Sequence, residues 1–175
     1  MNQPGEAMEI RPLRDNEVEA ASALAGDIWR AHYPGIISMA QIESMLAERY
    51  NAVVIREELQ RRDVWWDVLL LNGQMSGYTS YFFTSAPGTV KIDKLYLHPR
   101  AQRKGYGGQL IDHVAQQMAA HGCTHLTLAV NRHNKTAIGA YRKHGFVIAN
   151  TSLKKIAGGF WMDDYIMVKV VKREV

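Results

Sequence analysis

Apolar and polar positions along this chain of 175 residues follow strand-like patterns in its middle third. Residues 64–71 are rich in β-branched and aromatic side chains, and Asn72-Gly73 is a strong hairpin signal before a partner strand at about 75–84. Pro87-Gly88 then turns the chain into a third apolar stretch, 89–97. The pattern therefore predicts three consecutive antiparallel strands.

The preceding third of the chain predicts a short strand followed by helices. Residues 8–11 form the strand, and apolar residues between Val18 and Trp29 recur at helical spacing until Pro34-Gly35 ends the helix. Ser38-Met39-Ala40-Gln41 has the pattern of a capping box and starts a second helix. Residues 51–62 are expected to add more helix.

The last third alternates between helices and strands. A helix follows Gly105, and it is the first segment that allows a parallel crossover, so the expected sheet is mixed. The complete order is β-αα-βββ-α-β-α-ββ, an α/β arrangement in a single domain spanning residues 1–175. Its last elements are a helix ending near His121-Gly122, a strand at 125–130, a helix from about Asn134 to Gly145, and strands at 146–156 and 160–171 joined across Gly158-Gly159.

Composition narrows the class of protein. Apolar content of 47% and charged content of 22% are ordinary for a globular domain. No apolar run reaches the roughly 18 residues that a membrane span needs, so no membrane association is expected. The formal net charge is +4, but the basic residues are scattered, so nucleic acid is not expected as a partner. The lone Cys123 suits a reducing cytoplasm and a buried packing role.

A glycine-rich turn is the most informative stretch. It runs from Gln102 to Gly108, after a strand that stops at His98-Pro99 and before a helix with apolar residues at helical spacing. Such a turn presents unpaired N–H groups at the positive end of a helix dipole, which suits phosphate. The Gly-Lys-Ser/Thr of a Walker loop is missing, and the next strand has no acidic residue to hold a ribose. Taken alone, the turn favours an ordinary connection between a strand and a helix, with glycines for tight packing.

Two motifs together resemble one family. Gln102-x-x-Gly105-x-Gly107 matches the Q/R-x-x-G-x-G/A signature of the GNAT superfamily of acyl-CoA-dependent N-acetyltransferases. The stretch Asn134 to Phe146 resembles its second signature, N-x-x-A-x-x-x-Y-x-x-x-G-F. The resemblance implies the GNAT fold, a mixed twisted sheet of about six or seven strands with helices on both faces, and acetyl-CoA as cosubstrate. Arg103 departs from the pattern, since many members have glycine there.

The resemblance also implies a set of cofactor contacts. The strand before the turn would offer backbone groups to the pantetheine arm, and the turn would hold the pyrophosphate. The side chains of Arg103 and Lys104 either reach phosphate oxygens or are simply solvated. Asn134 would bind the CoA arm, with an N-cap as the alternative, and Tyr141 is the candidate general acid. The expected cofactor residues are Leu95, Tyr96, Leu97, Gln102, Arg103, Lys104, Gly105, Tyr106, Gly107, Gly108, Asn134, Ala137 and Tyr141.

The base and the acceptor site are less defined. Asp93 is a candidate base because it precedes Leu95 by two residues and hence lies on the same face of the strand, although an exposed or ion-paired aspartate is an equal alternative. His32 and His98 are further candidates. The acceptor pocket is expected between the first two helices and the last two strands. Its expected residues are Trp29, His32, Tyr33, Asp163 and Asp164, with no metal.

The acceptor chemistry follows from the two aspartates. Asp163 or Asp164 would attract an ammonium group, although in an alternating strand one of them faces away. The surrounding segment also looks like the tails of bacterial members that acetylate polyamines or protein amino groups. The leading hypothesis is acetyl transfer to a primary amine of a small molecule or protein. The alternatives are a non-catalytic CoA-binding or sensor domain and a basic nucleic-acid-binding module. The sequence leaves the oligomeric state open, a homodimer being one option.

Overall fold

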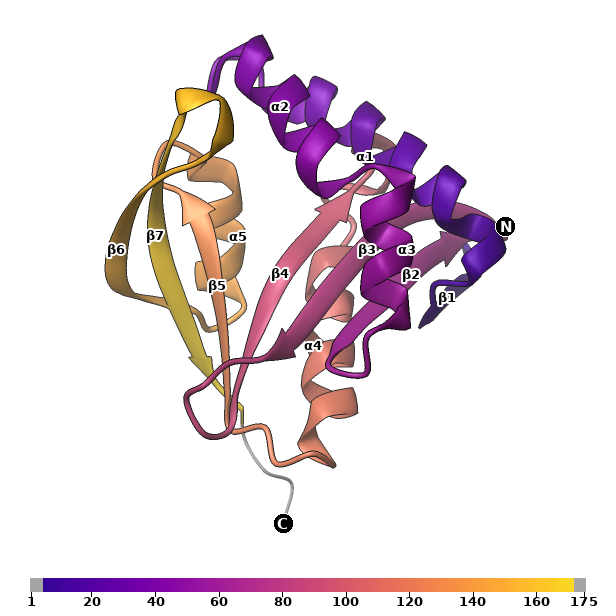
Figure 1. Ribbon diagram of the computed structural model, residues 1–175. Helices are drawn as coiled ribbons and strands as arrows, with labels where there is room; N and C mark the ends of the chain where they lie inside the picture. Colours follow the sequence, from indigo (N-terminus) through magenta and orange to yellow (C-terminus); the bar gives the residue numbers. More distant parts are fainter. Residues whose placement is uncertain (1–4, 172–175) are drawn as a thin grey trace.

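A computed structural model describes residues 5–171 of the chain. Seven strands form one sheet in the order β1-β2-β3-β4-β5-β7-β6 (Figure 1). Every neighbouring pair is antiparallel except β4 and β5, which confirms the mixed sheet. The strands are β1 (Met8–Pro12), β2 (Val64–Leu71), β3 (Gln74–Phe83), β4 (Thr89–Leu97), β5 (His125–Asn131), β6 (Val147–Lys155) and β7 (Trp161–Val170).

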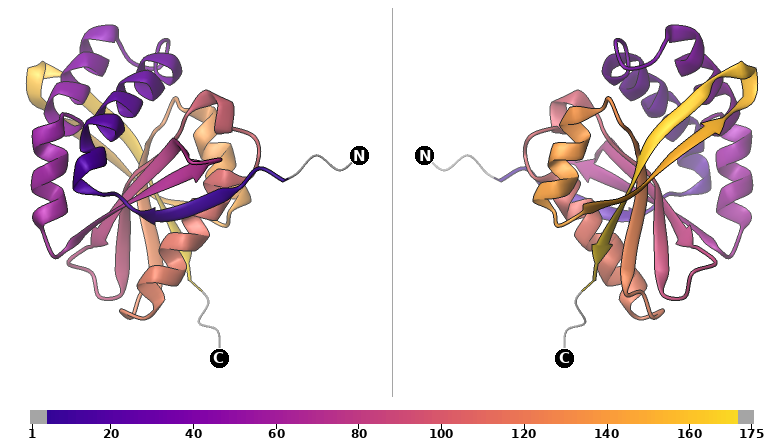
Figure 2. Two further views of the ribbon diagram at one scale, coloured as in Figure 1. Left: turned by 90° about the vertical axis from the view of Figure 1, so that its right-hand side faces the viewer. Right: turned by 90° about the vertical axis from the view of Figure 1, so that its left-hand side faces the viewer.

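Five α-helices cover both faces of the sheet (Figures 1 and 2). On one face the first three helices bury an aromatic-rich core that includes Trp29, Trp66 and Tyr78. On the other face α4 and α5 pack Ile111 and Ile138 against the sheet. No helix within residues 5–171 is long and apolar enough to cross a membrane. The helices are α1 (Val18–His32), α2 (Met39–Arg49), α3 (Ala52–Gln60), α4 (Tyr106–Ala119) and α5 (Lys135–Lys143).

The expected elements are all present, and local signals account for several of their ends. The Ser38 side chain caps α2 by accepting from the Gln41 amide, as the capping-box pattern predicts. Asn72 and Gly73 both have positive φ (49° and 78°), which is the requirement of a two-residue type I′ hairpin. The predicted additional helix is α3, capped by Asn51. Cys123 is buried, in agreement with the predicted packing role.

The parallel contact between β4 and β5 is short. Only three residue pairs form it, from Thr89–Lys91 on β4 and His125–Thr127 on β5. Beyond these pairs the two strands diverge, and each leaves one edge without a strand partner (Figure 1). At the far end of the opening the Gln41 Nε2 of α2 donates to the Trp161 carbonyl of β7 (3.3 Å). The sheet is therefore split by a wedge-shaped gap that helices α1 and α2 border on one side.

A β-bulge interrupts β4 at the edge of this gap. Ser80 and Tyr81 of β3 oppose Lys94 and Ile92, which leaves Asp93 without a partner on β3. Ile92 packs in the core under α4 and α5, whereas the Lys94 ammonium lies over aromatic rings of the opposite core.

The bulge corrects the prediction that Asp93 and Leu95 share a face. Leu95 packs against the cores on the α4 side, and Asp93 forms an ion pair with Arg49 of α2 on the other side. The prediction assumed a regular strand, and one extra residue reverses the alternation of side chains.

Candidate active site

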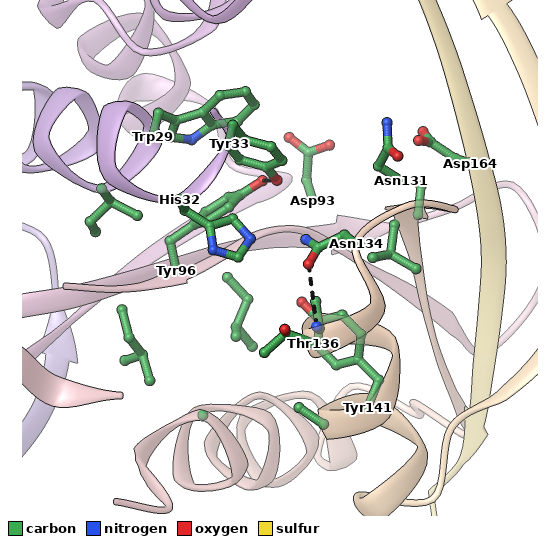
Figure 3. A pocket seen from close by; sticks show the side chains of 18 of the residues that line it. Trp29, His32, Tyr33, Asp93, Tyr96, Asn131, Asn134, Thr136, Tyr141 and Asp164 are labelled. Carbon is green, nitrogen blue, oxygen red and sulfur yellow. Dashed lines mark hydrogen bonds between the residues drawn. The ribbon is translucent and has the colours of Figure 1, made fainter. Parts of the chain in front are cut away.

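A cavity of about 1150 Å³ fills the gap between the diverging strands (Figure 3). Its walls come from α1, α2, the second half of β4, the glycine turn, the end of β5, α5 and the β6–β7 pair. This volume exceeds the 300–1000 Å³ that is usual for small-ligand pockets, so the cavity has room for a cofactor and an acceptor together. Most of the predicted cofactor and acceptor residues meet here from segments far apart in the sequence.

The glycine turn forms one end of the cavity. Gly105 (φ 86°) is the N-cap of α4, and Gly107 and Gly108 lie in the first turn of this helix and line the cavity. The Gln102 side chain donates to the Leu97 carbonyl (3.1 Å) and ties the turn to β4. These free amides at a helix N-terminus are suited to an anionic group such as a pyrophosphate.

Two details of the turn concern Arg103 and Gly108. Arg103 adopts a positive φ of 61°, a conformation that glycine takes at little cost, and this explains why glycine is usual at this position of the motif. The imidazole of His144, at the end of α5, lies against Gly108 so closely that a Cβ there would be 2.2 Å from its Cε1. His144 therefore occupies the space of a side chain at position 108 and lines the cofactor end of the cavity.

The N-terminus of α5 supplies a second group of cofactor candidates. Asn134 is buried and its Oδ1 accepts from the Ala137 amide (3.3 Å), so the N-cap role is present. Tyr141 lies further along the helix and faces the cavity (Figure 3). Burial raises the pKa of the Tyr141 phenol, and no residue between 5 and 171 accepts a hydrogen bond from it. The phenol thus stays protonated at neutral pH and keeps its donor for a ligand.

Aromatic residues of α1 and β4 form the wall opposite α5. The Tyr33 and Tyr96 hydroxyl oxygens are 2.9 Å apart, and the Trp29 ring packs on Tyr33 with 4.3 Å between ring centroids. His32 projects from α1 toward Asn134 (Figure 3), and burial lowers the pKa of its imidazole while the Asn134 side chain acts in the opposite direction. A neutral imidazole and a row of phenols therefore face the middle of the cavity.

Asp93 is held by positive charge on three sides. Its carboxylate lies 2.6 Å from Arg49, 2.8 Å from Lys94 and 3.7 Å from Lys91. Burial raises the pKa of Asp93, but the three cations together have the larger effect and lower it to about 2. Lys94 itself is 1% exposed and also lies 3.5 Å from Glu58. A carboxylate with so low a pKa takes up a proton poorly, so an electrostatic role is favoured over proton abstraction. Its catalytic role stays a prediction.

The neighbouring aspartates of β7 face opposite ways. Asp163 forms an ion pair with Arg132 (2.9 Å) and does not line the cavity. Asp164 lines the cavity, is 6% exposed and lies beside Asn131 of β5 (Figure 3). Burial raises the pKa of the Asp164 carboxyl, and no residue in the described range forms a hydrogen bond or ion pair with it. The sequence predicted this division but not which aspartate faces inward.

The cavity collects most, but not all, of the predicted residues. Lys104 and Tyr106 point away from it to Glu6, at 3.6 Å and 2.7 Å, and His98 caps the short turn after β4. Every other predicted cofactor residue, together with Asp93 and the acceptor residues other than Asp163, lines the cavity. Charged or titratable cavity-lining residues that sequence reasoning missed include Arg49, Lys91, His144 and Lys154. Three of them lie outside the motifs, and His144 occupies a variable position of the second motif.

The fold and the cavity define a class before any relative is considered. A mixed sheet that opens between β4 and β5, with a glycine turn at the mouth of the opening, is the arrangement expected of a CoA-dependent N-acetyltransferase. Comparison with known proteins agrees. The model of the acetyltransferase (GNAT) family matches residues 27–146.

Relatives of known structure and activity extend this agreement. A spermidine N(1)-acetyltransferase of Thermoplasma acidophilum is 28% identical over 148 residues, covering 83% of this chain and 91% of the relative. The crystal structure of the PaiA N-acetyltransferase of the same organism, in complex with coenzyme A, superposes with a TM-score of 0.80 at 25% identity, covering 94% and 99% of the two chains. A GCN5-related N-acetyltransferase structure from Rhodopseudomonas palustris shares the fold, with a TM-score of 0.76 at 22% identity and 97% and 98% coverage.

The chain belongs to the acetyltransferase (GNAT) family. It is an acetyl-CoA-dependent N-acetyltransferase that transfers an acetyl group to an amine. The comparisons offer no support for the non-catalytic alternative.

Proposed function

We propose that the acceptor is a small aliphatic primary amine that enters as an ammonium ion and binds to Asp164. The observation that carries this proposal is the state of Asp164, a carboxylate that is almost completely buried, lines the cavity and has no partner among residues 5–171. A buried charge without a partner is costly, and an ammonium ligand supplies the missing partner. The relative that is a spermidine N(1)-acetyltransferase supports an aliphatic amine acceptor.

The two cavity aspartates would then serve different steps. Asp93 stays ionised among its cations, whereas the raised pKa of Asp164 suits it to take a proton from the bound ammonium. The half-buried, neutral His32 is another cavity group that can accept a proton. Environments that push the pKa values of two acids apart commonly separate a charge-stabilising group from a proton-transferring one.

The transfer itself requires few groups. The amine nitrogen forms a bond to the acyl carbon, and the bond between that carbon and the CoA sulfur breaks. Two protons leave the nitrogen of the original ammonium. The base passes one of them to solvent, and the CoA thiolate takes up one proton to become the free thiol, which accounts for the other. Tyr141 is the proposed donor to that thiolate, since its phenol is protonated and faces the cavity. The amides of Gly107 and Gly108 would hold the pyrophosphate. We place the reaction in the cytoplasm, in keeping with the buried, unpaired Cys123.

The test compares two adjacent substitutions that remove one charge each. Asp164→Asn is expected to lower kcat/KM for primary amines by roughly 10-fold to 150-fold, the equivalent of a hydrogen bond to a charged group worth about 1.5–3 kcal/mol. Asp163→Asn is the matched control, because its carboxylate faces Arg132 outside the cavity. Thiol release should be measured with spermidine, cadaverine, an aminoglycoside and an N-terminal peptide.

The KM for acetyl-CoA separates acceptor effects from cofactor effects. Both variants should keep the wild-type KM for acetyl-CoA, since neither aspartate is placed at the cofactor end. Equal acceptor kinetics for Asp164→Asn and Asp163→Asn would remove Asp164 from the acceptor site.

A further inference from the structure

We call the part of the cavity away from the glycine turn the acceptor end. It has acidic and basic side chains in equal number. Polycations such as spermidine are recognised by an excess of negative charge, which attracts them and holds each ammonium. Here the negative groups are offset, so a second or third ammonium of the acceptor gains little. The acidic residues are Glu48, Asp93 and Asp164, and the basic residues are Arg49, Lys91 and Lys154.

The partly exposed cations Arg49 and Lys91 and the carboxylate of Asp164 come from different walls of the cavity. On the wall formed by α2 and β4, the Asp93 carboxylate is surrounded by Arg49, Lys91 and Lys94. Lys94 is buried and also lies 3.5 Å from Glu58, so Arg49 and Lys91 are the cations of this group that are partly exposed. On the wall formed by β7, Asp164 has no ion pair or hydrogen bond within residues 5–171, and the charges of Lys91, Lys154 and Arg49 act on its carboxyl from a distance, against the effect of burial on its pKa. The cavity therefore presents the partly exposed cations Arg49 and Lys91, here called the cationic wall, to one part of an acceptor and the Asp164 carboxylate to another.

Arg49 and Lys91 have N–H donors that their contacts with Asp93 do not use. Arg49 has five N–H donors, of which the contact with Asp93 uses one, and its side chain is 34% exposed where it lines the cavity. Lys91 is also 34% exposed, and its ammonium lies 3.7 Å from Asp93, too far for a hydrogen bond. Both side chains can therefore donate to an anionic group in the cavity. A guanidinium next to an ammonium is a good site for a carboxylate.

We propose that the acceptor is an amino-carboxylate, with its primary amine at Asp164 and its carboxylate at Arg49 and Lys91. This inference rests on the proposed function, because it accepts Asp164 as the ammonium site and adds a second point of attachment. Two attachment points of opposite charge fix the orientation of a flexible chain across the cavity. They also discriminate against amines that lack the anionic group, which leave the cationic wall unpaired.

The experiment uses acceptors that differ only in the anionic group. A series of ω-amino acids from 3-aminopropanoate to 6-aminohexanoate is compared with the corresponding ω-amino carboxamides, which keep the shape and lose the charge. Wild-type kcat/KM is expected to be at least 10-fold higher for one or more of the acids than for the matching amide. Spermidine and cadaverine, as polycations, should rank with the amides.

Variants of the cationic wall test whether the preference comes from it. Lys91→Met should reduce the acid-to-amide ratio at least fivefold, and Lys91→Arg should restore most of it. Lys155→Met is the matched control. Lys155 follows Lys154 at the end of β6 but does not line the cavity, so this variant should keep the wild-type acid-to-amide ratio.

The possible results separate this inference from the function beneath it. If amides or spermidine are acetylated as efficiently as every acid of the series, the amino-carboxylate inference is wrong and amine acetylation stands. An acid preference that survives in Lys91→Met at full size also overturns the inference. Transfer to none of these amines overturns both.

Discussion

A methyl group at Gly108 tests the close packing of α4 against α5 at the cofactor end. In Gly108→Ala the new Cβ would lie 2.2 Å from the Cε1 of His144 and 2.9 Å from both ring nitrogens. Carbon atoms pack at about 3.5–4.0 Å, so the imidazole must move by more than about 1 Å. Gly107→Ala is the matched control, because its Cβ would meet only the Leu97 Cδ1, at 3.8 Å.

The expected magnitudes follow from two opposing effects. Overpacking costs about 1–3 kcal/mol, whereas alanine in place of helical glycine gains up to about 1 kcal/mol. Gly108→Ala should therefore lower the free energy of unfolding by about 1 kcal/mol, and Gly107→Ala should leave it unchanged or raise it. In a His144→Ala background the clash is absent, so Gly108→Ala becomes stabilising. The coupling energy between positions 108 and 144 should be about 2 kcal/mol.

Thermal unfolding is measured for the wild type, Gly108→Ala, His144→Ala and the Gly108→Ala/His144→Ala double variant, which together form a double-mutant cycle. Gly107→Ala is measured beside them as the control. For a chain of this size 1 kcal/mol corresponds to about 2–4 °C in Tm. Calorimetric titration with CoA adds a functional readout, because the displaced His144 ring narrows the cofactor end and should weaken binding in Gly108→Ala but not in the double variant. If Gly108→Ala has the same effect in both backgrounds, the contact between α4 and α5 does not exist as described.

Other substitutions test the remaining parts of the site. Tyr141→Phe should lower kcat by about 10²–10⁴-fold with little change in the KM for acetyl-CoA; a loss below threefold, with chemistry rate-limiting, leaves Tyr141 a packing residue. Gly107→Glu should abolish CoA binding without unfolding the protein, and unchanged affinity in a titration would remove the turn from the cofactor site. Asp93→Asn should cost about 3–5 kcal/mol at pH 7, because buried Lys94 loses its nearest carboxylate. Since the folded pKa of Asp93 is about 2, below its ordinary value, this difference should shrink as the pH falls from about 4 towards 2 in urea unfolding; a difference independent of pH contradicts the ion-pair account.

The order of elements and the cofactor end could be predicted because local signals determine them. The positive φ at Gly105 and the N-cap at Asn134 are properties of short stretches of sequence. The resemblance to the two family motifs then assigned both stretches to the binding of the same ligand, CoA. Even the conformation of Arg103 has a local signal, since the corresponding position in the motif usually holds glycine. These features do not depend on how distant segments pack.

The acceptor end could not be predicted because it depends on side-chain alternation and on contacts between distant segments. The bulge at Asp93 adds one residue to β4 and so directs Asp93 toward Arg49, 44 residues earlier in the chain. Period-two alternation assigned Asp93 to the wrong face of β4, and no sequence pattern indicated that Lys94 would be buried beside it. For Asp163 and Asp164 the alternation was correct, but the direction depended on how β7 pairs with β5 and β6.

The short pairing of β4 with β5 has a consequence for the lifetime of the protein in the cell. Three residue pairs join the strands on one side of the gap. On the other side the Gln41 side chain donates to the Trp161 carbonyl, and Ile156 and Met162 pack against the core under the first three helices. A cofactor that lies in the gap contacts both sides and adds to the cohesion between them. At a free concentration 100 times its Kd, such a ligand stabilises the folded state by about 2.7 kcal/mol. Proteolytic degradation through the open state should therefore slow by about a hundredfold when acetyl-CoA is abundant, so that the amount of enzyme follows the supply of its own cosubstrate.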